Sequence, residues 1–138
     1  MVLAVLLPGS AMADSNISCA ILDGFASLTR ETGPVSFDLR LIDQTPECSR
    51  NLEIGGKQAV TCGWAYDYRS DVATQDFQTT VDMLEDCARF TGTDPARVSH
   101  PDSYDLRQFA LGSTLVSVSL KDKGALDQTW LFLRSVED

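Results

Sequence analysis

Four cysteines in a chain of 138 residues constrain this fold more than any other feature. No two of them are spaced as a CxxC pair, and the chain's one histidine, His100, is the only other soft metal ligand of note. An even cysteine count in a small domain is typical of structural disulfides, so we predict two bridges and no metal site. The four positions are Cys19, Cys48, Cys62 and Cys87.

The N-terminal segment predicts export. Residues 2–7 are apolar, Pro8-Gly9 follows, and Ala11-Met12-Ala13 offers a small-x-small cleavage site before Asp14. We therefore expect a signal peptide over residues 1–13, truncated at its start because it lacks a basic segment, and one globular domain over residues 14–138. The expected location is periplasmic or secreted, and no other apolar run approaches the roughly 18 residues of a membrane span.

The charge balance limits the classes of partner. Twenty acidic and eleven basic residues give a net charge of -9. Nucleic acids and anionic membranes bind clustered Lys and Arg, so both are disfavoured as partners. A protein partner, basic in character, would suit this surface, although the interpretation we favour is that the acidity keeps an exported protein soluble. With 43% hydrophobic residues, the chain has enough apolar side chains for one core.

Periodicity in the first half predicts a helix and a strand. Apolar residues recur at helical spacing from Ser15 to about Glu31, and Asp14 or Ser15 could cap that helix. Residues 35–41 then alternate apolar and polar side chains, as in a strand with one buried face. Residues 43–57 contain Pro46 and two glycines, which favours a long loop carrying the second cysteine.

The second half predicts a further helix and more strands. An aromatic-rich strand is expected over residues 60–68, followed by a helix from Ser70 or Asp71 to about Phe90 that Gly92 would end. Residues 93–113 carry turn signals and are expected to form a loop, although 104–111 could instead be a short helix or extended chain. Residues 115–120 and 128–136 are expected to form a hairpin. The resulting order αββαββ predicts an α+β fold, with two helices packed on an antiparallel sheet of about four strands.

The expected layout also predicts how the cysteines pair. Helix and strand rises of about 1.5 and about 3.3 Å per residue place Cys62 and Cys87 at similar distances, roughly 26 Å, from the turn that joins their elements. The same reasoning brings Cys19 and Cys48 to comparable distances from the turn between the first helix and strand. We therefore predict the bridges Cys19–Cys48 and Cys62–Cys87.

The loop around His100 is the candidate for catalysis. Ser99 or Ser103 could serve as a nucleophile, with His100 as base and Asp102 or Asp105 as the group that orients it. However, the members of such sets usually come from separate elements, and the chain has no G-x-S-x-G motif. Ser and Asp beside proline are ordinary turn residues, which is the interpretation we favour.

The same loop is the candidate binding surface. Its polar and aromatic side chains suit recognition, because binding residues concentrate in loops. The residues proposed for binding are Ser99, His100, Tyr104 and Arg107.

Three other segments could serve recognition or chemistry. The strand from Trp64 to Arg69 has the residue types that anchor interfaces, but its alternation favours core packing, with Trp130 and Phe132 as expected neighbours. The Lys121–Gly124 segment is expected to be a soluble turn. A third cluster, which we expect on the solvated face of the second helix, is formed by Asp82, Glu85 and Asp86.

Three functions remain open at this stage. The favoured one is a binding or inhibitory module of the periplasm or extracellular space. The second is a small hydrolase or transferase that uses His100, and the third is a structural component of the envelope. No sequence motif indicates a cofactor.

Overall fold

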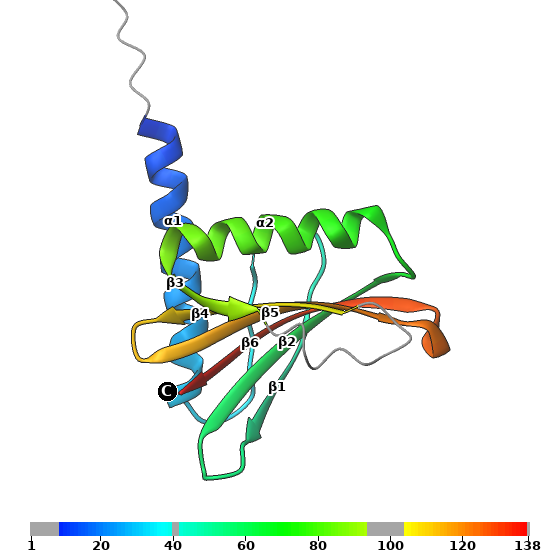
Figure 1. Ribbon diagram of the computed structural model, residues 1–138. Coiled ribbons are helices and arrows are strands. Elements are labelled where there is room, and N and C mark those ends of the chain that lie inside the picture. The colour runs from blue at the N-terminus through cyan, green and yellow to red at the C-terminus, as the bar shows by residue number, and fades with distance from the viewer. Residues whose placement is uncertain (1–8, 40–41, 94–103, 138) are drawn as a thin grey trace, which may run out of the picture.

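The computed structural model describes residues 9–39, 42–93 and 104–137 of the chain, and the side chains of 18–39, 42–92 and 105–137. Two helices lie on one face of a six-stranded antiparallel sheet (Figure 1), which confirms the α+β class but gives six strands instead of about four. The elements in chain order are α1 (Gly9–Ser27), a short 3-10 helix η1 (Leu28–Arg30), β1 (Glu47–Leu52), β2 (Gln58–Asp67), α2 (Asp71–Cys87), β3 (Arg89–Thr93), β4 (Tyr104–Leu111), β5 (Thr114–Lys123), the 3-10 turn η3 (Gly124–Leu126) and β6 (Gln128–Glu137).

The sheet has the strand order β1-β2-β6-β5-β4-β3. Strands β3 to β6 form a meander in which each strand pairs with the next, and β6 then pairs with β2. The hairpin of β1 and β2 therefore extends one edge of the sheet, and β3 forms the other edge. The predicted aromatic strand and C-terminal hairpin are confirmed as β2 and as β5 with β6.

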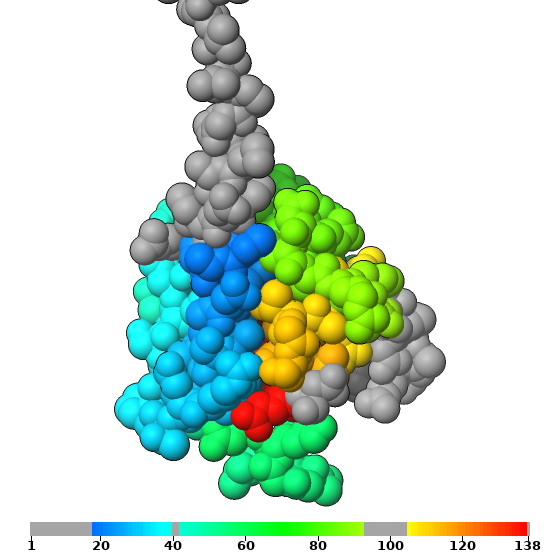
Figure 2. All heavy atoms as spheres, turned by 90° about the vertical axis from the view of Figure 1, so that its left-hand side faces the viewer, coloured from blue at the N-terminus to red at the C-terminus, as the bar shows by residue number. Residues whose placement is uncertain are grey.

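The two helices bury the core against one side of the sheet. Leu22 and Phe25 of α1 and Leu84 of α2 are fully buried against Leu131 and Leu133 of β6. Figure 2 shows the described part of α1, in blue, beside the end of α2, so the two helices form one layer. No helix among residues 9–39, 42–93 and 104–137 is long and apolar enough to cross a membrane.

The start of α2 is confirmed where the sequence predicted it. Ser70 is the N-cap, and its Oγ accepts a hydrogen bond from the N–H of Val72 at 3.2 Å. The predicted end was wrong, because the helix stops at Cys87 and Gly92 lies within β3 instead of capping it. The start of α1 was also placed too late, since the helix already includes Gly9. Ala11, Met12 and Ala13, which have high helix propensity, favour this extension.

Both predicted disulfides were wrong. The structure pairs Cys19 with Cys87 and Cys48 with Cys62. The cause is β1, which occupies part of the segment expected to be a loop. In the hairpin, Cys48 is directly opposite Cys62, so the two sulfurs meet across neighbouring strands. Cys19 is then left for Cys87, and this bridge joins the two helices.

The predicted strand over residues 35–41 was also wrong. Residues 35–39 have no strand partner, yet their side chains alternate as expected: Leu39 is buried, Val35 and Phe37 are half-buried, and the residues between them are exposed. The ring of Phe37 lies 4.7 Å from that of Phe25, centroid to centroid. This segment is thus an extended chain that packs its apolar side chains on α1 without joining the sheet.

Part of the segment expected to be a loop is strand. Tyr104–Leu111 forms β4, and Arg89–Thr93 forms β3, so the prediction of a loop over residues 93–113 was wrong for its second half. Residues 94–103 lie outside the described residues.

A buried polar network fixes the turn between β2 and α2. Thr129, which is 1% exposed, donates from Oγ1 to Asp122 Oδ1 at 2.6 Å and accepts from the N–H of Arg69 at 2.7 Å. Arg69 Nε also donates to Asp122 Oδ2 at 3.3 Å. Arg69 has a φ of 55°, a left-handed conformation that is unfavourable for a side chain of this size. The contacts to Asp122 and Thr129 hold it there.

Candidate functional site

The sheet face opposite the helices carries a second set of aromatic side chains. Along β6, Leu131 and Leu133 point into the core, so Trp130 and Phe132 point to the opposite side, where both are half-exposed. The prediction that they pack beside Trp64 was therefore wrong. Trp64 itself is 1% exposed, which confirms its place in the core, and its Nε1 donates to the carbonyl of Gln44.

Small residues on β2 make room for these two rings. Gly63 is opposite Phe132 and Ala65 is opposite Trp130 in the strand register. A Cβ atom at Gly63 would lie 2.9 Å from Phe132 Cε1 and 3.1 Å from Trp130 Cε3, which is too close for either contact. The rings thus lie over the bare backbone of Gly63, and any other residue there would displace them.

The two rings form a parallel pair. Their centroids are 5.6 Å apart and their planes differ by 9°. The indole of Trp130 is held in place because its Nε1 donates to Gln128 Oε1 at 3.1 Å. Aromatic rings in this arrangement present a flat, polarisable surface whose orientation is set before any ligand arrives.

Lys123 brings a positive charge to this ring pair. Its Nζ lies 5.6 Å from the ring centroid of Trp130 and 5.4 Å from that of Phe132, which is the range of a cation–π contact. Within the described part of the chain, no carboxylate oxygen lies within 4.0 Å of Lys123 Nζ, the distance expected for an ion pair. Among the described residues, the ring faces are the groups that contact its charge.

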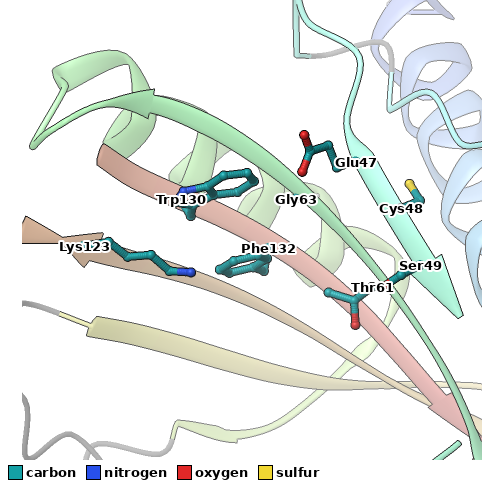
Figure 3. Close-up of a pocket in the computed structure, with 8 residues that line it drawn as sticks. All are labelled: Glu47, Cys48, Ser49, Thr61, Gly63, Lys123, Trp130 and Phe132. Atoms are coloured by element: carbon teal, nitrogen blue, oxygen red, sulfur yellow. The ribbon is translucent and has the colours of Figure 1, made fainter. Parts of the chain in front are cut away.

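These groups border an open hollow of about 360 Å³ (Figure 3). Glu47 and Ser49 of β1 lie on the side of the hollow away from Lys123, and the ring pair lies between. The hollow combines an apolar surface with a few polar groups at its margin, which is the usual composition of a ligand site. Its lining residues are Glu47, Cys48, Ser49, Thr61, Gly63, Lys123, Trp130 and Phe132.

Two other hollows lie beside the segment that follows η1. One, of about 490 Å³, is lined by Asp38, Ile42 and Asp43 among others, and it borders residues 40–41, which are not described. The other, of about 320 Å³, lies between α1 and residues 36–38. Among the described residues, neither lining has a parallel ring pair or a lysine. The hollow over Gly63 is therefore the better candidate.

Most of the loop residues proposed from the sequence cannot be compared with this site. Ser99, His100, Asp102 and Ser103 lie outside the described residues, so their catalytic and binding roles stay predictions. Tyr104 is the first residue of β4, and the position of its side chain is likewise not described.

Arg107 is part of β4 and not of a loop. In the strand register Arg107 is opposite the buried Val118, so its side chain lies on the helix side of the sheet. Its guanidinium there is 5.9 Å from the ring centroid of Phe77. It also forms an ion pair with Asp105 on the same strand. These contacts give Arg107 a packing role.

Of the remaining sequence predictions, one is confirmed and one is wrong. Asp82, Glu85 and Asp86 are exposed on α2, which confirms the predicted solvated face. The segment Lys121–Lys123 belongs to β5 and not to a turn, so that prediction was wrong. The hairpin turn begins only at Gly124, and Lys123 instead contributes to the hollow.

The fold also changes the ionisation of Tyr66. Burial raises its pKa above the usual range, and the hydrogen bond from its hydroxyl to Asp76 Oδ2, at 2.7 Å, adds to that effect. Tyr66 is therefore a neutral donor at physiological pH. Its hydroxyl links β2 to α2 on the helix side of the sheet, whereas the hollow lies on the opposite face.

Comparison with known proteins does not assign this site. No family model and no curated protein matches the chain. Among solved structures, the crystal structure of CalU16 from Micromonospora echinospora is similar over 69% of each chain, with 14% sequence identity and a TM-score of 0.35. A likeness at that TM-score carries no argument about function, so the function is argued from the hollow itself.

Proposed function

We propose that this protein is a binding module of an oxidising compartment, and that the hollow beside Trp130 and Phe132 is its binding site. The observation that carries the proposal is the parallel ring pair on the sheet face that the helices leave uncovered. Aromatic side chains in a preformed concavity, with a few polar groups beside them, are typical of ligand sites.

The cost of keeping the rings there supports a binding role. Gly63 loses more conformational entropy on folding than any other residue type would, and glycine in a strand interior also lacks a side chain to pack. A structural alternative is that the rings merely shield the glycine backbone, as aromatic residues opposite glycine can in sheets. That alternative accounts for Phe132, which is directly opposite Gly63, but not for the alignment of Trp130 by Gln128 or for the nearby Lys123.

The oxidising compartment is proposed from the cysteines and the leader together. All four cysteines form disulfides in the structure. Disulfides persist in the periplasm and outside the cell and are rare in the cytosol, and the N-terminal sequence resembles the end of a signal peptide.

The test is to identify the compound that is bound to the protein when it is purified from its native host. The oxidised protein would be purified from the host envelope fraction under gentle conditions, and small molecules released on denaturation would be quantified by mass spectrometry. Trp130→Ala should lose the bound compound. Phe90→Ala is the matched control, because Phe90 is 52% exposed on β3 at the sheet edge far from β1. Equal recovery of a compound from both variants would contradict the proposal, as would its absence from the wild-type protein.

A further inference from the structure

We infer that the hollow binds a small anion built on a flat ring, of the aromatic carboxylate class, whose carboxylate faces Lys123 and whose far end carries a hydrogen-bond donor. The inference deepens the proposed function and rests on it. Three features of the hollow carry it: the charge at one end, the flat ring pair in the middle, and the acidic group at the other end.

The charge comes from β5. Lys121 and Lys123 alternate with the core-facing residues of that strand, so both lie on the open face, and Lys121 is directly opposite Trp130. Neither lysine has a carboxylate partner within 4.0 Å among the residues that the structure describes. In a chain with a net charge of -9, two cations that have no such partner among the described residues, beside an aromatic pair, form a local site of the opposite sign. A partly desolvated ammonium attracts an anion more strongly than one in bulk water does.

The shape favours a flat ligand. The planes of Trp130 and Phe132 differ by only 9°, and Gly63 keeps a side chain from rising between them and β1. A ring laid against such a surface gains apolar burial and stacking together. The volume of about 360 Å³ lies near the lower limit of roughly 300 Å³ for ligand pockets, which limits the ligand to one ring or two fused rings.

The acidic end orients the ligand. Glu47 is directly opposite Gly63 in the β1–β2 register and lies across the ring pair from Lys123 (Figure 3). Its carboxylate repels an anion and accepts hydrogen bonds. A ligand with a carboxylate at one end and a hydroxyl or N–H at the other would therefore bind in one direction only. Ser49 and Thr61, which pair across the same strands, add hydroxyl groups beside that far end.

The experiment is isothermal titration calorimetry on the oxidised full chain with 4-hydroxyphenylacetate as the probe. Three analogues separate the three features. The neutral 4-hydroxyphenylacetamide removes the charge, 4-hydroxycyclohexylacetate removes the flat ring, and 4-methoxyphenylacetate removes the donor. Each should bind more weakly than the probe, with the amide weaker by about tenfold or more, which is the effect of one charge-assisted hydrogen bond.

Two pairs of variants locate the binding site. Lys123→Gln should weaken binding of the probe by about tenfold, whereas Lys57→Gln, in the exposed hairpin turn between β1 and β2, should leave it unchanged. Gly63→Ala should abolish binding because its Cβ would displace both rings, whereas Gly24→Ala, with nothing within 4 Å of the added Cβ, should not change it. Circular dichroism of each variant shows whether it folds.

The possible outcomes separate this inference from the proposed function. Equal affinity for the acid and the amide, or no effect of Lys123→Gln, would contradict the inference that the ligand is an anion. No heat with the probe at millimolar concentrations would do the same. If the compound recovered from the native host is a neutral saccharide or a neutral peptide, and Trp130→Ala no longer retains it, the inference is wrong and the binding function stands. If Trp130→Ala has no effect on that compound, both are wrong.

Discussion

The two disulfides should contribute unequally to stability, with the bridge between the helices contributing more. Cys19 and Cys87 are 68 residues apart in sequence, whereas Cys48 and Cys62 are 14 apart. In the chain-entropy model the cost of closing a loop in the unfolded chain grows with the logarithm of its length. The two loops then correspond to about 4.4 and about 3.0 kcal/mol at 25 °C, a difference of about 1.4 kcal/mol.

The comparison must avoid changing the core, because Cys62 is fully buried and Cys87 is only half-buried. Two single-bridge proteins provide this. In C19A/C87A only the short loop is closed, and in C48A/C62A only the long one. The free energy of unfolding of each is measured in urea by tryptophan fluorescence, before and after reduction with dithiothreitol. The loss on reduction isolates the bridge, because no side-chain volume changes.

We expect a loss of about 4.4 kcal/mol for the long loop and about 3.0 kcal/mol for the short one. An equal loss, or a larger loss for the short loop, would refute the chain-entropy reasoning. The pairing itself is checked by mapping with trypsin under non-reducing conditions, because cleavage after Lys and Arg leaves each cysteine in a different peptide. Peptide 41–50 should be linked to 58–69, and the peptide ending at Arg30 to 70–89. A link between the peptide ending at Arg30 and 41–50 would contradict the structure.

Three further changes test the described contacts, each in urea unfolding. Thr129→Val should lower the free energy of unfolding by about 3 kcal/mol, because it leaves the buried Asp122 carboxylate short of a donor; a loss below about 1 kcal/mol would contradict this. Gly24→Ala should raise it by about 0.5 to 1 kcal/mol, because the helix interior gains a residue of lower chain entropy, and an unchanged value would show strain at this position. The raised pKa of Tyr66 contributes stability that is complete below about pH 10, the pKa of the unfolded chain, and is lost as pH rises towards the pKa of the folded protein. Tyr66→Phe should therefore make the free energy of unfolding fall less steeply with pH above about pH 10. An unchanged slope would refute that cause.

The sequence predicted best where one pattern had one structural meaning. Strand β2 and the start of α2 were located correctly because aromatic alternation is followed at once by a capping serine, Ser70. Residues 35–39 show the limit of the same method. Their alternation records which side chains are buried, but it cannot show whether the backbone finds a strand partner, and here it does not.

Strand β1 was missed for the opposite reason. Its sequence is polar, and one of its faces is turned to solvent, so hydrophobic periodicity is absent. What makes it a strand is pairing with β2, a contact between residues that only the hairpin brings together. That error also produced the wrong disulfides, because the expected pairing relied on a returning strand at 35–41 and on a loop around Cys48.

The candidate site was hidden in the sequence by a different ambiguity. In β6 the core residues Leu131 and Leu133 and the open-face residues Trp130 and Phe132 are all apolar, so alternation cannot decide which pair faces the helices. The deciding fact is the register with β2, which places the aromatic pair over a strand position that only glycine can occupy.

A glycine inside a strand is therefore the most useful sequence signal that went unused. Gly63 lies within an aromatic-rich strand, where glycine weakens the strand and often marks a close approach by other atoms. Here those atoms are two rings 2.9 to 3.1 Å from where its Cβ would be, and the rings in turn hold Lys123. The chain thus accepts a less stable strand at the point where the sheet face opposite the helices becomes concave and aromatic, with Lys123 beside the rings. Gly63→Ala with unchanged probe binding would show that this cost serves packing alone.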